Sequence, residues 1–581
     1  MIKKDYSKLE KDDLLKVIEK LESRKKYGLI WDEEKVKEQF EKDAENALPV
    51  LKEVKSKEII DKNSGPLNIF IEGDNYHALS VLNFTHQGKV DVIYIDPPYN
   101  TGSKDWKYNN DYVDKNDSYI HSKWLSFMSK RLQLAKNLLK ETGVFICTID
   151  ENEHATLGML LDEIFPDREI VCVTIVHNPG GIQGKNFSYC HEYAYFVYPK
   201  GGTYISNIKR DDIAPTPLRD WGKENSKRQG AKNCFYPIFV KKGTIVGFGN
   251  VCPDNFHPKG ANVENKDGII EVYPIDKNGV ERKWRFSRQS IESIKDELIS
   301  QEIKGGMVIL RDKRDYRWKT VWTDAKYNAN VYGTQMVNKL VKTTFPFPKS
   351  FYAVKDCIKA CIHPKDAIIL DFFAGSGTTG HAVLELNKEE KNELKQKLSD
   401  GKITEKECGE QINQVGNRKF ILCTNNENNI AEDVCYPRIK KVIEGHKDFP
   451  DITGIPSNLK YFKTKFVKDA SNKDDFKIRI TKECTEMLCL REGIFDEMKK
   501  TDDYRVFQQG DKTLAVYYSL DRKALSELKK ELNKIDGDKI FYCFTLDPLG
   551  VDKSDFISWN NVSLEPIPQK ILDVYKQIYE Y

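Results

Sequence analysis

Long apolar runs are missing from this sequence of 581 residues. No stretch approaches the roughly 18 consecutive apolar residues that a membrane-spanning helix needs. The first residues, Met1–Asp5, lack the apolar segment of a secretory signal peptide. We therefore expect no membrane association and a cytoplasmic location.

Clustered metal ligands are also missing. The 13 cysteines include no C-x-x-C pair, and the ten histidines include no H-x-x-x-H. Cys357 and Cys361 lie four residues apart on an expected helix, but no second pair stands at zinc-site spacing. We expect no structural metal, and reduced, mostly buried thiols.

A strong excess of one charge is absent as well. The chain has 92 basic and 89 acidic residues, a net charge of +3, with 39% hydrophobic and 31% charged residues. This composition fits a globular protein, and the length predicts two to four domains. Any nucleic-acid surface must therefore be a local basic patch.

Composition and hydrophobic spacing divide the chain into five segments. They are a charged helical region (1–64), half of an α/β domain (65–199), a module rich in Gly, Asn and Pro (200–330), the second α/β half (331–445, with a charged helical insertion at 388–416) and an α+β region (446–581). In the two halves, apolar strands alternate with helical stretches. This alternation predicts an open, mostly parallel α/β sheet.

The first chemical motif is Asp96-Pro97-Pro98-Tyr99, directly after the apolar strand 90–95. Ligand sites in such sheets lie at the carboxyl ends of strands, and two prolines make the loop rigid. The Asp96 carboxylate and the Pro97 carbonyl can accept both N–H bonds of an exocyclic base amine, while Tyr99 offers a face for an extruded base. The alternative is a proline turn that merely ends a strand.

The second motif is a glycine turn between a strand and a helix. Its residues are Asp371, Phe372, Phe373, Ala374, Gly375, Ser376, Gly377 and Thr378. Glycines allow close backbone approach, and N–H groups at a helix start suit a carboxylate. Gly375, Gly377 and Gly380 also fit a dinucleotide fingerprint, but that site needs an acidic residue about 20 positions later, where the charged insertion begins. A plain strand–helix turn is the other alternative. A methyltransferase needs both motifs together, whereas an oxidoreductase has no use for the first.

With these motifs the chain resembles the β-type amino-methyltransferases of DNA, and most narrowly the modification (Mod) subunit of type III restriction–modification systems. The resemblance covers about 25–200 and 331–466 and includes Asp96–Gly102, His191-Glu192-Tyr193 and Phe373–Gly377. It implies a Rossmann-like class I methyltransferase fold that uses S-adenosylmethionine, with a target-recognition domain inserted between the halves.

The resemblance also implies roles for single residues. Asp96, Pro97, Pro98 and Tyr99 would hold the target amine and base, and Asp371 to Thr378 would line the cofactor site. Asp74 would touch the cofactor's adenine end, and Pro348 and Lys349 would form an extra cofactor element. One departure concerns the ribose contact, because the strand from Phe420 ends without the usual acidic residue; Asn425 or Glu427 could replace it.

The inserted module mixes basic and aromatic residues, as a DNA-reading domain does. They are Lys209, Arg210, Arg219, Trp221, Lys223, Lys227, Arg228, Lys232, Phe235 and Tyr236; Arg282, Lys283, Trp284, Arg285, Phe286 and Arg288; and Arg311, Lys313, Arg314, Arg317, Trp318 and Lys319. Solvated surface charge is the alternative for any single one. We expect double-stranded DNA as the partner.

Three functions stay open, of which adenine-N6 DNA methyl transfer is favoured. A cytosine-N4 enzyme would use the same amine geometry, although Asp rather than Ser at position 96 favours adenine. A DNA-binding specificity subunit with a vestigial site is the third. The resemblance further implies a homodimer that docks a separate helicase–nuclease subunit. Our hypothesis is that this subunit docks on the N-terminal helices or on the region after 446.

Overall fold

The computed structural model describes residues 29, 31, 47–60 and 65–579, except 109–110, 115–116, 184, 211, 342, 344, 447–452, 469–472, 548–549, 553–555, 557–558 and 560. The chain forms two compact units, residues 206–318 and all the rest. Most of the first 46 residues of the charged helical region expected at 1–64 lie outside the described residues.

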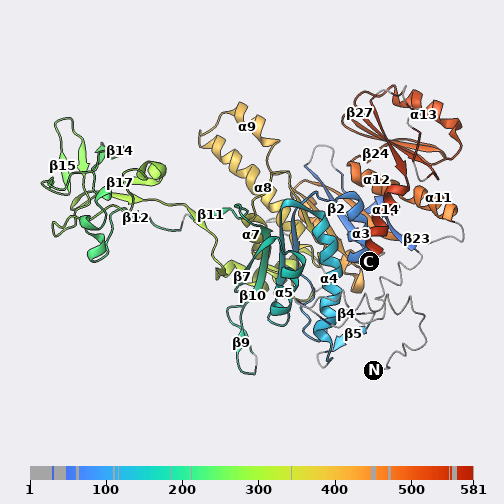
Figure 1. The fold of residues 1–581 in the computed structure, drawn as a ribbon, viewed down its shortest axis with the longest axis horizontal. Coiled ribbons are helices and arrows are strands. Elements are labelled where there is room, and N and C mark those ends of the chain that lie inside the picture. Colours follow the sequence, from blue (N-terminus) through green and yellow to red (C-terminus); the bar gives the residue numbers. More distant parts are fainter. Residues whose placement is uncertain are drawn as a thin grey trace, which may run out of the picture. The chain divides into compact units, whose positions relative to one another are not determined.

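A ten-stranded sheet organises the larger unit (Figure 1). Its order is β1 (Ala47–Glu53), β23 (Asn458–Lys468), β2 (Leu67–Glu72), β22 (Lys419–Thr424), β21 (Ile368–Asp371), β3 (Val90–Ile95), β6 (Leu139–Ile149), β10 (Glu192–Pro199), β7 (Arg168–Ile175) and β20 (Val321–Trp322). Six neighbouring pairs are parallel and three antiparallel. The predicted mostly parallel α/β fold is confirmed.

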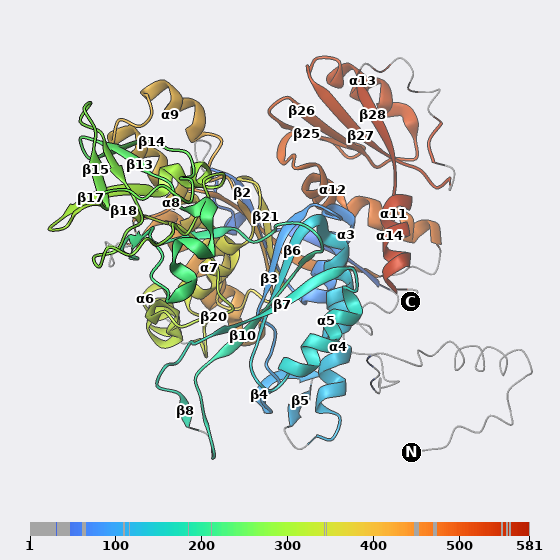
Figure 2. The same cartoon turned by 60° about the vertical axis from the view of Figure 1, so that its left-hand side comes forward.

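Two groups of helices cover this sheet (Figure 2). One is α3 (Asn75–Thr85), α4 (Ile120–Leu138) and α5 (His154–Ile164); the other is α6 (Gln335–Leu340), α7 (Phe351–Ala360), α8 (Thr378–Ser399) and α10 (Tyr436–Glu444). The central strands β3 and β6 are apolar and buried, as strands covered on both faces must be. Helix α8 continues to α9 (Glu405–Ile412), and the two pack together as the helical insertion predicted at 388–416.

Two terminal segments contribute strands that the sequence interpretation missed. Residues 47–53 were expected to be helical, but they form β1, which pairs antiparallel with β23. In turn β23 pairs parallel with β2, so it belongs to the main sheet rather than to a separate α+β region. Val50 and Leu51 are fully buried. Burial of this apolar pair between charged neighbours outweighs the helical character of the surrounding sequence.

The rest of the C-terminal region forms a second sheet. Its order is β24 (Asp496–Lys500), β25 (Tyr504–Gln509), β26 (Lys512–Tyr517), β27 (Asp538–Phe544) and β28 (Val562–Ile567), with helices α11 (Lys473–Glu483), α12 (Thr485–Glu492), α13 (Leu525–Leu532) and α14 (Gln569–Tyr579). Helices α12 and α14 pack on α3, and α12 also contacts β26. These contacts join the second sheet to the main one.

Residues 206–318 form short antiparallel strands. They are β11 (Asn207–Lys209) with β19 (Asp315–Arg317); β12 (Thr216–Pro217), β18 (Gly306–Arg311) and β17 (Leu298–Ile303); and β14 (Thr244–Phe248), β13 (Ile238–Lys241), β16 (Ile270–Val272) and β15 (Asn262–Glu264). Tyr236 and Trp284 lie in a core of their own. Two small hairpins, β4 (Ser103–Tyr108) with β5 (Asp111–Asp114) and β8 (Ile182–Gln183) with β9 (Ser188–Tyr189), belong to the larger unit.

Phe70 on β2 tests whether β23 is integral to the sheet. Its ring is fully buried and stacks on Tyr461 of β23, with centroids 4.7 Å apart. We expect Phe70→Ala to lower the free energy of unfolding by about 3–5 kcal/mol, because a buried ring is lost and a cavity remains. Urea titration would measure this. Leu520→Ala, at a side chain 46% exposed, is the control; an equally small loss in both variants would contradict the packing described.

Candidate functional site

The loop Asp96-Pro97-Pro98-Tyr99 follows β3 and is held from both sides. Trp124 of α4 donates its indole N–H to the Pro98 carbonyl at 2.8 Å. Asn100, in the left-handed region at φ 60°, donates its amide to the buried carboxylate of Glu153. Two prolines and these two anchors fix the loop backbone.

Asp96 has two partners in addition to the loop. Thr148 of β6 donates its hydroxyl to the Asp96 carboxylate at 2.7 Å, and the Lys349 ammonium lies 3.3 Å from the same oxygen. Burial raises the pKa of Asp96, the Lys349 charge opposes that rise, and the Glu192 carboxylate adds to it. Asp96 is therefore a partly buried carboxylate whose charge depends on one lysine.

Lys349, Glu192 and Tyr99 form one cluster. The Tyr99 hydroxyl donates to Glu192 at 3.1 Å. The Lys349 ammonium contacts both the Glu192 carboxylate and the Tyr99 hydroxyl, and it lies 4.1 Å from the Tyr99 ring centroid. Burial alone would raise the pKa of Glu192. The Lys349 ammonium opposes burial, and the pKa of Glu192 lies below its ordinary value. The expected cofactor element thus places its lysine against the D-P-P-Y loop, while its neighbour Pro348 is buried.

The glycine turn is closed by its own aspartate. The Asp371 carboxylate accepts the Phe373 N–H at 2.9 Å and the Thr379 hydroxyl at 2.6 Å. Gly375 and Gly377 have φ of 49° and 78°, which side chains other than glycine rarely adopt. Helix α8 begins at Thr378, so its first N–H groups follow the turn directly.

Arg438 lies behind this turn, and the sequence motifs gave no signal for it. It is fully buried on α10 and donates to the Ser376 hydroxyl at 3.0 Å and the Thr378 hydroxyl at 2.8 Å. No carboxylate pairs with it in the part of the chain that the structure describes. Burial lowers the pKa of Arg438 to about 10. A buried cation without a counter-ion is costly, and its place beside a helix start suits an anionic ligand.

Asp74 stands in the turn after β2, next to the glycine turn. Its carboxylate caps α3 by accepting the Tyr76 N–H at 2.8 Å. The following Asn75 donates its amide to the Phe372 carbonyl at 3.0 Å. Asn425 and Glu427, proposed for the ribose contact, are both exposed beyond the end of β22. These residues therefore border the glycine turn on the side of β2 and β22.

One strand pairing brings the two motifs together. β3 and β21 lie parallel, with Val92 opposite Ile369 and Ile93 opposite Leu370. The Asp91 carboxylate reinforces the pair by accepting the Ile368 N–H at 2.9 Å. Because parallel strands end at the same edge, the D-P-P-Y loop and the glycine turn become neighbours.

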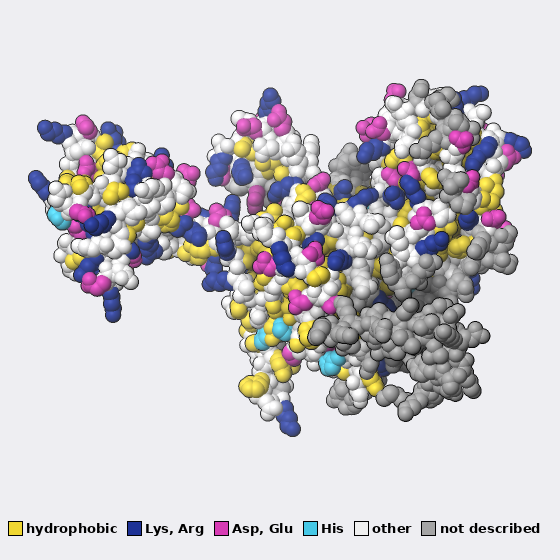
Figure 3. Space-filling model, in the orientation of Figure 1, with side chains coloured by type: hydrophobic (Ala, Val, Ile, Leu, Met, Phe, Trp, Pro, Cys, Tyr) yellow, Lys and Arg dark blue, Asp and Glu magenta, His cyan; other side chains and the backbone are white. Residues whose placement is uncertain are grey.

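The basic and aromatic residues of 206–318 divide into two kinds. Phe235, Tyr236 and Trp284 are buried in the interior of this unit, so they are not available to stack on bases. Arg228 is 4% exposed and pairs with Glu281 at 2.9 Å. Trp221, in contrast, is 64% exposed and lies beside Arg219. On the face that Figure 3 shows, basic and acidic side chains of this unit alternate.

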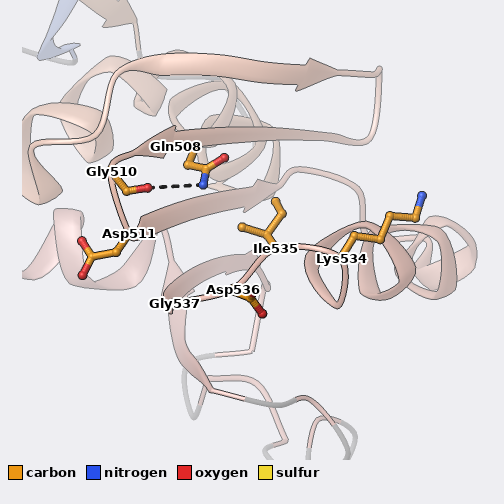
Figure 4. Close-up of a pocket in the computed structure, with 7 residues that line it drawn as sticks. All are labelled: Gln508, Gly510, Asp511, Lys534, Ile535, Asp536 and Gly537. Atoms are coloured by element: carbon orange, nitrogen blue, oxygen red, sulfur yellow. Dashed lines mark hydrogen bonds between the residues drawn. The ribbon is translucent and has the colours of Figure 1, made fainter.

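A depression in the second sheet contains no residue of either motif (Figure 4). It is lined by Gln508, Gly510, Asp511, Lys534, Ile535, Asp536 and Gly537.

In the described part of the chain, no helix is long and apolar enough to cross a membrane, and no three metal-ligating side chains cluster. The 13 cysteines are free thiols.

Known proteins resemble the chain over its motif-bearing part. Residues 90–433 match the family model described as DNA methylase. The EcoPI Mod subunit of a type III restriction-modification enzyme, from Escherichia phage P1, is 30% identical over 65% of this chain and 64% of its own length. The StyLTI Mod subunit of Salmonella typhimurium is 30% identical over 66% and 56%. The type II methyltransferase M.KpnI of Klebsiella pneumoniae is 32% identical over 56% and 79%. The chain thus spans less than two thirds of either Mod subunit, and the predicted resemblance to them is confirmed.

Asp371 provides a test of the glycine turn through pH. Burial raises its pKa to about 7 from an ordinary value of 3.8. Between these two values the folded protein keeps a proton that the unfolded chain releases, so stability falls as pH rises through this window. Asp371→Asn should remove that fall, which amounts to roughly 4 kcal/mol at most.

Urea titrations between pH 5 and pH 8 would compare the variant with the wild type. The wild type should lose stability relative to Asp371→Asn as pH rises. Asp366→Asn, at an exposed carboxylate nearby, should follow the wild type. Parallel pH curves for Asp371→Asn and the wild type would show that Asp371 is not protonated in the fold.

Proposed function

The chain belongs to the DNA methylase family, and on that premise we propose that it methylates adenine N6 in double-stranded DNA as the modification subunit of a type III restriction–modification system. S-adenosylmethionine is the proposed methyl donor. The observation that carries the proposal is the parallel pairing of β3 with β21, which sets the D-P-P-Y loop beside the glycine turn. The Mod subunits among the relatives support the restriction–modification context.

The target amine would be held by the loop after β3. An exocyclic amine is a weak nucleophile because its lone pair is delocalised into the ring. The Asp96 carboxylate and the Pro97 carbonyl accept its two N–H bonds and direct the lone pair away from the ring plane, while Tyr99 stacks on the extruded base. The anchors from Thr148 and Trp124 keep these acceptors in place before the base arrives.

The cofactor site would be the glycine turn. The residues fit a zwitterionic ligand, because the buried cation of Arg438 and the start of α8 favour its carboxylate. The Ser376 and Thr378 hydroxyls accept hydrogen bonds from Arg438, and Gly375 and Gly377 have positive φ values that residues with a side chain rarely adopt. Asp74 and Asn75 border the other end of the proposed cofactor site. When bound, S-adenosylmethionine supplies an electrophilic methyl group.

DNA and partner subunits complete the proposal. Exposed basic residues of 206–318, with Trp221 and Arg219, would contact phosphates and bases. We further propose a homodimer that docks a helicase–nuclease subunit, with the second sheet after residue 470 as docking candidate. The cytosine-N4 alternative keeps the same site, and the specificity-subunit alternative is disfavoured by the intact cluster around Asp96.

Methyl transfer tests the function directly. The full chain, labelled S-adenosylmethionine and PCR-amplified DNA of mixed sequence should yield N6-methyladenine on nucleoside analysis. Asp96→Asn should reduce the rate by about 100-fold or more, because a charged acceptor is lost where charge develops. Cofactor affinity, measured by calorimetry, should change little.

The other outcomes separate the alternatives. N4-methylcytosine as the sole product would overturn the adenine assignment. Tight DNA binding without any methylated product would favour the specificity subunit. Equal loss of cofactor affinity and rate in Asp96→Asn would place Asp96 in the cofactor site instead.

Lys349 gives a prediction about pH. Burial raises the pKa of Asp96, and the Lys349 ammonium limits that rise. Lys349→Met removes that charge, so the Asp96 pKa rises and the acid limb of kcat/KM shifts to higher pH. Lys355→Met is the matched control, since Lys355 is also mostly buried and paired, with Glu389. An unshifted limb in Lys349→Met would contradict the electrostatic role.

A further inference from the structure

The most exposed large apolar side chains of the described residues are two phenylalanines, Phe347 at 92% and Phe187 at 79%. Phe187 lies at the end of the β8–β9 hairpin, whose strands pair Ile182 with Tyr189. Ile182 and Tyr189 are also exposed, at 59% and 44%. In Figures 1 and 2 this hairpin extends beyond the end of the main sheet. Exposed apolar groups that gather in one place mark an interaction surface.

Both phenylalanines stand on segments that lead to the proposed target site at Asp96 and Tyr99. Phe187 precedes Glu192 by five residues, which is about 16 Å of extended chain, and Glu192 accepts the Tyr99 hydroxyl. Phe347 precedes Lys349 by two residues, and Lys349 pairs with Glu192 and Asp96. The buried Lys349–Glu192 pair therefore joins the two chain segments at their ends nearest Tyr99.

The backbone of both segments is constrained close to the exposed rings. The hairpin stem is closed by the Asn178 N–H, which donates to the Cys190 carbonyl at 3.1 Å, and Gly181 turns at φ 71°. Phe347 itself has φ 52°, a conformation that costs energy in a residue with a side chain. Strain in an exposed aromatic residue next to a site indicates a functional rather than a packing role.

A base that is extruded from DNA leaves a gap in the stack. Proteins hold such distorted duplexes with apolar side chains inserted between base steps, and aromatic rings replace lost stacking for any base sequence. We propose that Phe187 and Phe347 form an apolar rim that inserts into double-stranded DNA beside the extruded base and fills its place in the stack. This inference rests on the proposed function and adds two residues that hold the duplex rather than the amine.

The test compares duplexes that differ only at the target pair. Once the methylated site is known, single-turnover methyl transfer is measured on a normal pair and on the same target opposite an abasic position, where extrusion costs little. Phe187→Ala and Phe347→Ala should each lose about 5- to 100-fold on the normal pair and less than about threefold opposite the abasic position. Phe187→Trp should keep the wild-type rate.

Met498→Ala is the matched control, because Met498 is an exposed apolar residue of the second sheet, at 62%. It should leave both rates unchanged. Equal losses on the two duplexes, or no loss on either, would overturn the rim. Unchanged melting temperatures confirm that the variants are folded, as expected at exposed positions.

Failure of the proposed function would look different. In that case the wild type itself transfers no methyl group to any duplex. The rim is then judged by the affinity of the full chain for mixed-sequence duplex DNA. Weaker binding by the two alanine variants than by Met498→Ala supports the rim, and equal binding by all three overturns it.

Discussion

The parallel pairing of β3 with β21 is the constraint on which the rest of the site depends. It joins two chain segments that the unit 206–318 separates in sequence, and it sets Asp96 and the glycine turn at one edge of the sheet. The Asp91 carboxylate, itself paired with Lys140 at 2.7 Å, bonds to the backbone of β21 and so adds a side-chain contact where the two strands meet. A site divided between two halves of a chain needs such a strand pairing, because the proximity of the reacting groups depends on it.

Unequal charge balance distinguishes the two ends of the site. Around Asp96 the carboxylates of Asp96 and Glu192 share one counter-ion, the Lys349 ammonium. Behind the glycine turn the buried Arg438 contacts only neutral groups among the described residues, namely the Ser376 and Thr378 hydroxyls, the Ser376 carbonyl and the His381 ring. Carboxylates at one end suit a group that donates N–H bonds, whereas a buried cation without a counter-ion suits a ligand that brings its own negative charge. The electrostatics thus agree with a base at one motif and a zwitterionic cofactor at the other.

Local sequence patterns predicted most of the main sheet and its helices, because their apolar periods are long and uninterrupted. Strand β1 was missed since its short apolar run is surrounded by charge, and its partner β23 lies more than 400 residues away. The motif residues could be named from the sequence, but the contacts that hold them in place could not. Lys349 and Glu192 are 157 residues apart, and Arg438 and Ser376 are 62 apart. Such contacts exist only after the sheet has formed, and His191-Glu192-Tyr193 carries no chemical signal by itself. Phe235, Tyr236 and Trp284 show the converse, since their composition suggested DNA contact and their burial shows a packing role.

The pairing of β3 with β21 also has a consequence for synthesis on the ribosome. The hydrogen bond from Ile368 to Asp91 spans 277 residues. At about 5–20 residues per second, β3 waits roughly 15–55 seconds for the strand that covers its edge. During this time an apolar strand is exposed with unpaired backbone groups, which favours association between nascent chains. The intervening residues 206–318 have a core of their own and can fold in that interval, so the order of translation lets the inserted unit fold before β21 completes the main sheet.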